Sequence, residues 1–305
     1  MMLVSYRLRD SERDWRVGMM HGQTVIDVSA YGSSDGRSYS SVQEFLPLLD
    51  EVGAWANQQL DAGNHVLSLE TLELGPPVPN PDKILCLGVN YREHAAEAQQ
   101  EIPVVPIVFA KFRNSLIGPT SPILLPHVSN LIDYEGELAV IIGKRCKAVA
   151  EQEALSYVAG YSIMNDVTAR DIQAQTSQWT AGKALDTFAP MGPGLVPASQ
   201  IPDPQTLTLI TRVNGQEVQH DNTANIIFSV VSAIAFLSSL MTLEPGDILA
   251  TGTPSGVGFK RTPPLYLQDG DVVEVEIERI GRLRNPVKRG EDLRKENRVK
   301  SEKYE

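Results

Sequence analysis

Residues 133–142, DYEGELAVII, join two glutamates to an apolar run that is typical of a β-strand. In an extended chain, residues two apart project to the same face, so Glu135 and Glu137 can present two carboxylates on one side, with their Cα atoms about 7 Å apart. Two such charges repel each other unless a cation lies between them, and hard oxygen ligands suit Mg²⁺ or Mn²⁺. Spacing alone favours a solvated strand end, as at residues 274–276, so the metal hypothesis needs further ligands.

A third carboxylate follows a second strand-like stretch. Asp166 comes directly after residues 161–165, YSIMN. It can complete a three-carboxylate site that leaves half of an octahedron open for water and substrate. The structural alternative is an aspartate that caps a helix N-terminus, and one loop can serve both purposes.

His94 and Glu97 form a candidate general-base pair. If residues 92–97 are helical, side chains three apart share a face. A carboxylate beside an imidazole orients the ring and raises its basicity, which suits a base that activates water. Taken alone, this spacing more often marks a pair on a helix surface.

Two lysines and one glycine-rich loop can meet an anionic substrate. Lys111 and Lys183 are each flanked by apolar or small residues, unlike the lysines near the end of the chain. The loop at residues 252–258, GTPSGVG, contains Thr253 and offers backbone N–H donors for an oxyanion. It has neither the spacing of a phosphate-binding P-loop nor that of a Gly-x-Ser-x-Gly elbow. A purely structural turn is an equal alternative for this loop.

Composition limits the classes of function. The chain has 305 residues and a formal net charge of −11, which argues against a nucleic-acid partner but not against an anionic substrate near local cations. No apolar run reaches the ~20 residues of a membrane span, and residues 1–14 contain no apolar signal region. We expect Cys86 and Cys146 to be buried, inert thiols and the protein to be cytoplasmic.

The chain divides at a proline-rich stretch. Residues 75–81, GPPVPNP, break helices and central strands. We therefore predict a small N-terminal domain over residues 1–75 and a catalytic domain over residues 76–287. A charged tail follows over residues 288–305, with 12 charged residues of 18, and we expect it to be a solvated helix or disordered.

The sequence pattern of the predicted catalytic domain is mostly typical of β-strands. We predict strands at residues 84–89, 138–142, 248–251 and 272–278, and a hairpin whose strands, 207–213 and 216–219, flank the turn Asn214-Gly215. Helical periodicity predicts helices at residues 42–59, 151–157 and 223–241, the last capped by Asn222 or Thr223. The fold class is therefore α+β and rich in strands.

The order of these motifs resembles that of the fumarylacetoacetate hydrolase family over residues 82–287. The motifs run as Gly-Val-Asn-Tyr, His94-x-x-Glu97, Lys111, Asp-Tyr-Glu-Gly-Glu137, Asn-Asp166-Val-Thr-Ala-Arg-Asp, Gly-Lys183-x-x-Asp-Thr and Gly-Thr253-Pro-x-Gly-Val-Gly. The His-x-x-Glu pair points to the acylpyruvase and oxaloacetate decarboxylase branch. The resemblance implies the family's mixed β-roll with a smaller N-terminal domain, and a homodimer.

The resemblance also implies roles for individual residues. Glu135, Glu137 and Asp166 match the family's Mg²⁺ or Mn²⁺ ligands, and Lys183 its active-site lysine. His94 and Glu97 match the dyad on a mobile lid. The resemblance implies that Arg170, Gln173 and Thr253 bind the substrate. We add Lys111, the cation discussed above, to these substrate-binding positions.

We expect a hydrolase that splits a C–C bond of an acylpyruvate or a related 2,4-dioxo acid. The alternative is decarboxylation or tautomerisation of oxaloacetate or a similar dioate at the same metal. A catalytically inactive scaffold is a third possibility, but it predicts a missing carboxylate or lysine, and none is missing.

Overall fold

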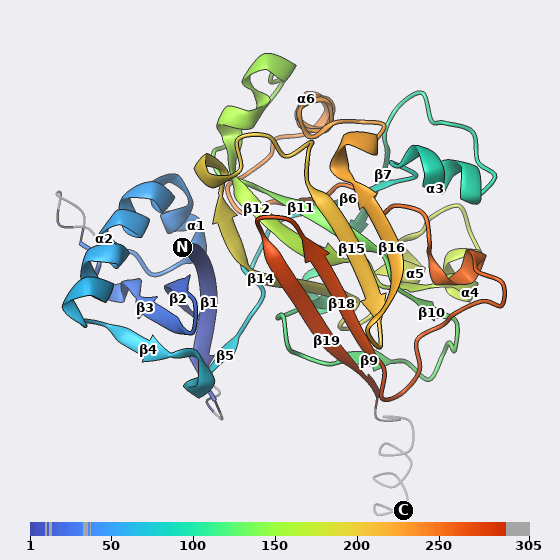
Figure 1. Ribbon diagram of the computed structural model, residues 1–305. Coiled ribbons are helices and arrows are strands. Elements are labelled where there is room, and N and C mark those ends of the chain that lie inside the picture. The colour runs from blue at the N-terminus through green and yellow to red at the C-terminus, as the bar shows by residue number, and fades with distance from the viewer. Residues whose placement is uncertain (10, 12–13, 33–35, 37, 291–305) are drawn as a thin grey trace, which may run out of the picture.

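One long β-sheet runs from the N-terminal segment into the centre of the molecule (Figure 1). The structure is a computed structural model and describes residues 1–9, 11, 14–32, 36 and 38–290. The sheet has the strand order β4-β3-β2-β1-β14-β12-β11-β17-β6-β7, with β5 paired to β1 and β8 to β14. A five-stranded sheet, β16-β15-β18-β19-β9, lies against it, and β10 pairs with β13. This arrangement is the β-rich α+β fold that the sequence predicts.

The strands have the following bounds. They are β1 (Met2–Leu8), β2 (Arg16–His21), β3 (Thr24–Asp27), β4 (Val66–Ser68), β5 (Leu72–Leu74), β6 (Ile84–Gly88), β7 (Ile107–Lys111), β8 (Leu116–Ile117), β9 (Ile123–Leu125), β10 (Ile132–Asp133), β11 (Gly136–Ile142), β12 (Val158–Asn165), β13 (Thr168–Ala169), β14 (Ala189–Pro197), β15 (Thr208–Val213), β16 (Gln216–Asn222), β17 (Ile248–Ala250), β18 (Val272–Ile277) and β19 (Gly281–Arg289).

Four of the six α-helices in the described residues have six residues or fewer, and the two longer ones pack buried apolar side chains against the strands. The α-helices are α1 (Val42–Phe45), α2 (Leu49–Ala62), α3 (Arg92–Glu97), α4 (Arg170–Gln173), α5 (Thr180–Lys183) and α6 (Val230–Leu240). The 3₁₀ helices are η1 (Val28–Ala30), η2 (Leu46–Leu48), η3 (Leu69–Thr71), η4 (Arg113–Ser115), η5 (Glu151–Tyr157), η6 (Ala198–Gln200), η7 (Thr223–Asn225) and η8 (Gly258–Lys260). None of those in the described residues has the length and apolar character needed to span a bilayer.

Strand β11 is buried on both faces, which explains its unbroken apolar run. Leu138, Val140 and Ile142 pack toward the five-stranded sheet and α6. Ala139 and Ile141 belong to the core shared with the N-terminal segment. The strand therefore cannot shift by one residue without exchanging these two sets of side chains, so its register is firmly specified.

The predicted hairpin and most predicted strands are confirmed. Asn214 and Gly215 have φ angles of 53° and 79° between β15 and β16, the positive values that a type I′ turn requires. Strands also form at the predicted positions in β6, β11, β17 and β18. Both cysteines are buried and free.

Two of the three helix predictions need correction. The helix expected over residues 42–59 is interrupted by the 3₁₀ turn η2, which contains Pro47. The helix predicted over residues 151–157 is confirmed with these bounds and is of the 3₁₀ type. The last helix starts at Val230 with Ser229 as its cap, because Asn222 caps the separate turn η7 instead.

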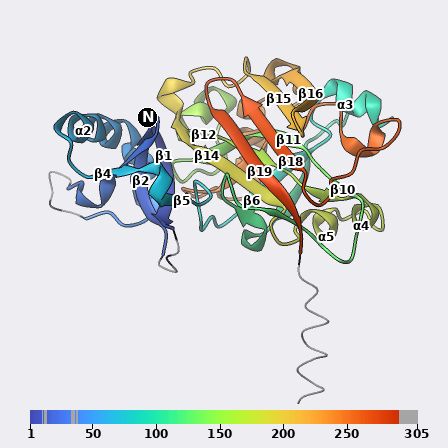
Figure 2. The same cartoon turned by 60° about the horizontal axis from the view of Figure 1, so that its bottom comes forward.

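Within the long sheet, the N-terminal strands join the remaining strands through β1, which pairs with β14 at Leu3 and Leu195 (Figure 2). The proline-rich stretch lies between β5 and β6. Strand β19 continues to Arg289 and pairs with β9, so residues 288–289 are strand and not tail. The remainder of the predicted tail, residues 291–305, lies outside the described residues.

Gly136 separates the two glutamates and allows the two sheets to approach each other. A Cβ atom there would overlap Thr211 Oγ1 and lie 2.9 Å from Val275 Cγ1. We predict that Gly136→Ala lowers the free energy of unfolding by about 1–3 kcal/mol, the usual cost of overpacking. Adding Thr211→Ala should restore part of that loss.

Denaturant unfolding of the two single variants and the double variant measures this effect. Thr211→Ala is the control, because its hydroxyl has no hydrogen-bond partner among the described residues. Equal stability of Gly136→Ala and the wild type would show that the sheets do not constrain this position.

Candidate active site

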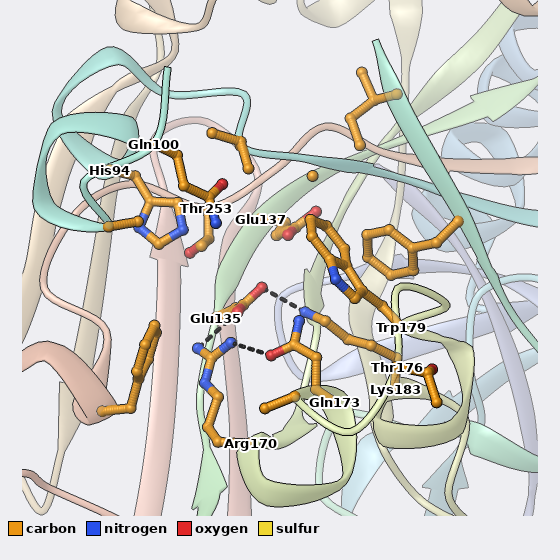
Figure 3. A pocket seen from close by; sticks show the side chains of 17 residues that line it. His94, Gln100, Glu135, Glu137, Arg170, Gln173, Thr176, Trp179, Lys183 and Thr253 are labelled. Carbon is orange, nitrogen blue, oxygen red and sulfur yellow. Dashed lines mark hydrogen bonds and ion pairs between the residues drawn. The ribbon is translucent and has the colours of Figure 1, made fainter. Parts of the chain in front are cut away.

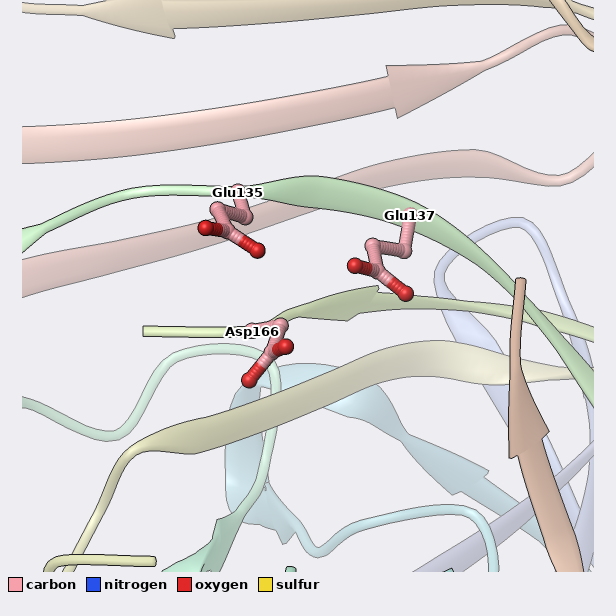
Figure 4. Close-up of side chains that lie close together, drawn as sticks. All are labelled: Glu135, Glu137 and Asp166. Atoms are coloured by element: carbon pink, nitrogen blue, oxygen red, sulfur yellow. The ribbon is translucent and has the colours of Figure 1, made fainter. Parts of the chain in front are cut away.

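Three carboxylates meet where β11 begins and β12 ends. Gly136 pairs with Asn165 in the antiparallel register, and Asp166 N donates to Glu135 O at 2.8 Å. Ligand oxygens of Glu135, Glu137 and Asp166 all lie within 4.8 Å of one another, and the three residues are 5%, 1% and 0% exposed. Figure 4 shows the three carboxylates turned into the same space between the strands. The structure thus brings together the three predicted metal ligands.

Two cations hold Glu135 ionised. Lys183 Nζ donates to Glu135 Oε2 at 2.8 Å, and Arg170 Nη2 forms an ion pair with Glu135 Oε1 at 2.7 Å. Burial acts to raise the pKa of Glu135, but the charges of Lys183 and Arg170 outweigh it and bring the pKa to about 2. Glu135 is therefore a carboxylate at any physiological pH.

Glu137 has a different environment. It accepts one hydrogen bond, from Gly252 N at 2.8 Å, and forms no ion pair within the part of the chain that the structure describes. Burial, followed by the charges of Asp166 and Glu135, raises its pKa well above the ordinary value. A cation between the three carboxylates would remove this repulsion.

The donor set fits a hard divalent cation. Three carboxylates give oxygen ligands only, as Mg²⁺ and Mn²⁺ prefer, and they occupy fewer than the six positions of an octahedron. The buried, unpaired Glu137 is the observation that supports a metal rather than a closed network of ion pairs.

Lys183 is placed as the sequence predicts, at the carboxylate cluster. It ends the short helix α5, and its Nζ contacts both Glu135 and Asp166, the latter at 2.7 Å. Burial acts to lower its pKa, but the carboxylates of Asp166 and Glu135 raise it overall. The side chain is therefore a permanent ammonium ion in the wall of the site.

Lys111 lies elsewhere than expected. Its ammonium group donates to Asp166 Oδ1 and to Val167 O, its side chain is fully buried, and it does not line the cavity. It binds Asp166, one of the predicted metal ligands, so the geometry gives it no direct access to a substrate in the cavity.

A cavity of about 240 Å³ opens in front of the carboxylates (Figure 3). In that view His94 and Gln100 lie on one side, Trp179 lies on the other, and Arg170 and Gln173 lie below Glu135. The volume is below the range of about 300–1,000 Å³ that drug-sized ligands occupy. The lining residues are Leu87, Gly88, Val89, His94, Ala98, Gln100, Phe109, Glu135, Glu137, Arg170, Gln173, Ala174, Thr176, Trp179, Lys183, Thr253 and Phe259.

The cavity has a polar side and an aromatic side. Arg170 Nη1 donates to Gln173 Oε1 at 3.1 Å, and both side chains face the cavity. On the other side, Trp179 packs edge-on against Phe109, with ring centroids 5.6 Å apart. A small anion with a short apolar body suits these walls.

The predicted pair His94 and Glu97 forms on α3. His94 Nδ1 lies 3.2 Å from Glu97 Oε2, and Glu97 Oε1 accepts Gly256 N at 3.0 Å. His94 lines the cavity and Glu97 stands behind it. The carboxylate at Nδ1 fixes the ring and leaves Nε2 as the nitrogen able to accept a proton.

Thr253 lines the cavity, but its hydroxyl is already used. It donates to Gly136 O at 3.0 Å and accepts from Gln219 Nε2 at 2.8 Å. Gln219, Trp179 and Phe259 were not predicted as site residues. Trp179 stands four residues before Lys183, and Phe259 directly follows the glycine-rich loop at residues 252–258, which were the available signals. Gln219 lies in the predicted hairpin strand, whose pattern indicates a turn and not a site.

The fold and the carboxylate site define a class of enzyme. The sequence pattern described as fumarylacetoacetate (FAA) hydrolase C-terminal matches residues 83–288. The chain therefore belongs to the fumarylacetoacetate hydrolase family, whose relatives with a named activity are enzymes.

Individual relatives match along nearly the whole chain. "Oxaloacetate tautomerase fahd2, mitochondrial" of Xenopus laevis is 42% identical over 291 residues, covering 94% of this chain and 90% of the relative. A putative HpcE protein from Mycobacterium smegmatis has a crystal structure with a TM-score of 0.81 at 32% identity, covering 95% of this chain and 100% of that chain. Maleylpyruvate hydrolase from Sphingobium sp. SYK-6, solved with manganese(II) and pyruvate, has a TM-score of 0.78 at 30% identity, with coverage of 95% and 100%.

The raised pKa of Glu137 predicts a pH-dependent metal affinity. In the metal-free protein Glu137 keeps its proton over a pH range in which an ordinary glutamate is ionised. A metal must displace that proton, so the affinity for Mg²⁺ should increase as the pH rises, with proton release on binding. Titration calorimetry in two buffers of different ionisation enthalpy measures both quantities.

Variants of the carboxylates test the ligand assignment. Glu135→Gln, Glu137→Gln and Asp166→Asn should each lose metal binding, because each loses a ligand and a compensating charge. Glu274→Gln on β18 is the matched control, since it removes a carboxylate with the same alternate spacing that pairs with Arg282 and Arg284 and does not line the cavity. Wild-type affinity in Glu137→Gln would refute the proposed centre.

Lys183 compensates two buried carboxylates, so its removal should affect stability as well as turnover. We predict that Lys183→Met abolishes activity and lowers the free energy of unfolding of the metal-free protein by about 3–5 kcal/mol, the usual effect of breaking a buried ion pair. Saturating Mg²⁺ should restore part of that stability. Thermal melts with and without Mg²⁺ test this, with the exposed Lys144→Met as control. Unchanged kinetics would remove Lys183 from the active site.

Proposed function

We propose that this protein is a divalent-metal-dependent tautomerase that interconverts the enol and keto forms of a small 2-oxo dicarboxylic acid, with oxaloacetate as the first candidate. The observation that carries the proposal is the cavity of about 240 Å³, whose wall contains Glu135 and Glu137 of the three-carboxylate centre together with Arg170 and Gln173. The centre suits a chelating 2-oxo carboxylate, and the two polar side chains suit a second carboxylate. The relative named oxaloacetate tautomerase supports the choice of substrate.

Glu135, Glu137 and Asp166 would hold the metal. When bound, the cation supplies a Lewis acid that polarises the 2-oxo group and so eases proton loss from the neighbouring carbon. The protein's own residues provide the remaining functions of binding, orientation and proton transfer.

Arg170 and Lys183 remain positively charged in the cavity wall. Both pKa values are raised overall, since the neighbouring carboxylates outweigh the burial that acts to lower them. Arg170 and Gln173 orient the second carboxylate through directed N–H donors. Trp179 and Phe109 limit the length of the substrate and exclude water from that side.

His94 carries the proton. Glu97 holds Nδ1, so Nε2 accepts the proton of the enol hydroxyl or of the carbon and returns it at the other position. Metal ligands cannot do this while they are coordinated, and Lys183 and Arg170 stay protonated. His94 is therefore the titratable group in the cavity wall best suited to the transfer.

Hydrolysis of an acylpyruvate is the second candidate, as the sequence led us to expect. The observation in its favour is the His94–Glu97 dyad, which can equally activate a water molecule for attack on a distal carbonyl. The related maleylpyruvate hydrolase shares the fold. Decarboxylation of oxaloacetate needs the same metal and no hydrolytic water.

A panel of 2-oxo acids decides among these reactions. With Mg²⁺ or Mn²⁺, we expect enol oxaloacetate to convert to the keto form with a higher kcat/KM than either acetylpyruvate cleavage or oxaloacetate decarboxylation. EDTA should abolish the activity. His94→Ala should lower kcat by about 10²–10⁴-fold, the usual contribution of general acid–base catalysis, without a change in metal affinity.

The exposed His220→Ala serves as the control for the histidine variant. The three reactions are followed separately, by loss of enol absorbance, by acetate formation and by pyruvate formation. A higher kcat/KM for acetylpyruvate cleavage than for tautomerisation would establish the hydrolase instead. A wild-type tautomerisation rate in His94→Ala would remove the histidine from the mechanism.

A further inference from the structure

Asp133 is a buried carboxylate next to the site that has no part in the mechanism above. It ends β10, two residues before Glu135, is 0% exposed and does not line the cavity. Its Oδ1 accepts Tyr134 N and Gly258 N, each at 2.8 Å. Its Oδ2 accepts Arg170 Nε at 2.9 Å and Phe259 N at 3.0 Å. Four donors from three segments therefore converge on one carboxylate.

Two of these segments form one wall of the cavity. Arg170 and Phe259 both line it, and the guanidinium carbon of Arg170 lies 4.3 Å from the centroid of the Phe259 ring. The face of the ring stabilises the guanidinium through a cation–π contact. Since Asp133 holds both the side chain of Arg170 and the backbone of Phe259, it fixes their relative position.

Asp133 also sets the charge balance at the metal ligands. Arg170 lies between two carboxylates, with Nε on Asp133 and Nη2 on Glu135. One arginine thus compensates two anions and leaves part of the charge of Glu135 for a cation. Without Asp133, the full charge of Arg170 would act on Glu135, which already has Lys183 as a partner.

We propose that Asp133 is a positioning residue that holds Arg170 toward the second carboxylate of the substrate and preserves the negative charge of Glu135 for the metal. The statement about the substrate rests on the proposed function. The statement about the metal rests only on the ion pairs, so the two can be tested separately.

The chemistry requires an aspartate at this position. Both carboxylate oxygens face N–H donors, so an asparagine must turn its amide N–H₂ toward two of them whichever way it is oriented. Asp133→Asn keeps the shape and removes the charge. It therefore separates the role of the carboxylate from that of the side-chain volume.

The first measurement is metal binding, with Mn²⁺ as the probe and no substrate present. Asp133→Asn should bind Mn²⁺ at least about three-fold more weakly than the wild type, because a negative charge is lost beside the centre. Asp171→Asn is the matched control, because Asp171 directly follows Arg170 in α4 and does not line the cavity. Its Oδ1 accepts a hydrogen bond from Ser129 Oγ at 2.6 Å. Unchanged Mn²⁺ affinity in Asp133→Asn would overturn the charge-balance part of the proposal.

The second measurement separates positioning from general damage. The KM for oxaloacetate should rise about ten-fold or more, as expected for loss of a hydrogen bond to a charged group, while kcat changes less. Inhibition by pyruvate, which lacks the second carboxylate, should weaken no more than Mn²⁺ binding does. An equal loss for both compounds would mean that Asp133 is merely structural.

A double-mutant cycle shows whether Asp133 acts through Arg170. In an Arg170→Met background at saturating Mn²⁺, Asp133→Asn should leave the oxaloacetate KM unchanged, because the arginine it positions is absent. If Asp133→Asn alone does not fold, Arg170→Met can still be compared with the double variant, because the double variant leaves no unpaired buried charge at these two positions. A similar rise in KM in both backgrounds would refute the proposal. If the wild type does not act on oxaloacetate, the Mn²⁺ measurement still tests Asp133.

Discussion

The mutual repulsion of three buried carboxylates is the constraint on which this structure depends. The antiparallel register of β11 and β12 brings Glu135, Glu137 and Asp166 within 4.8 Å of one another in the interior. Lys183, Arg170 and Lys111 compensate Glu135 and Asp166, and Glu137 remains without a cation among the described residues. This uneven compensation is the reason that we propose a metal site here rather than a closed salt-bridge network.

The surrounding structure supports that cluster in layers. Gly136 lets the second sheet approach β11, and the loop after β17 donates its backbone N–H to Glu137. Arg170 connects the metal ligands to the cavity wall, and His94 approaches from α3 on the opposite side. In the proposed mechanism, substrate binding, proton transfer and metal binding therefore fall to different elements that meet at the end of one strand pair.

The sequence was informative where a motif is local and chemically distinctive. The glutamate pair, Asp166, Lys183 and the His94–Glu97 pair could be predicted because their motifs follow one another in the order typical of the fumarylacetoacetate hydrolase family, whereas the spacing of each motif alone left a structural alternative open. The β-rich fold and the Asn214-Gly215 hairpin followed from periodicity and turn chemistry. Lys111 was assigned to the substrate because its apolar neighbours imply burial, but burial does not show which way an ammonium group points. Asp133 and Gln219 depend on contacts between distant segments, which no local pattern reveals.

The central claim is that Glu135, Glu137 and Asp166 together bind one divalent cation in front of the cavity. Anomalous diffraction from a crystal grown with Mn²⁺ and pyruvate tests it most directly. The account predicts one strong Mn²⁺ peak within bonding distance of all three carboxylates, with pyruvate oxygens completing its coordination. A peak that excludes Glu137, or no peak at the three carboxylates at saturating Mn²⁺, would contradict it.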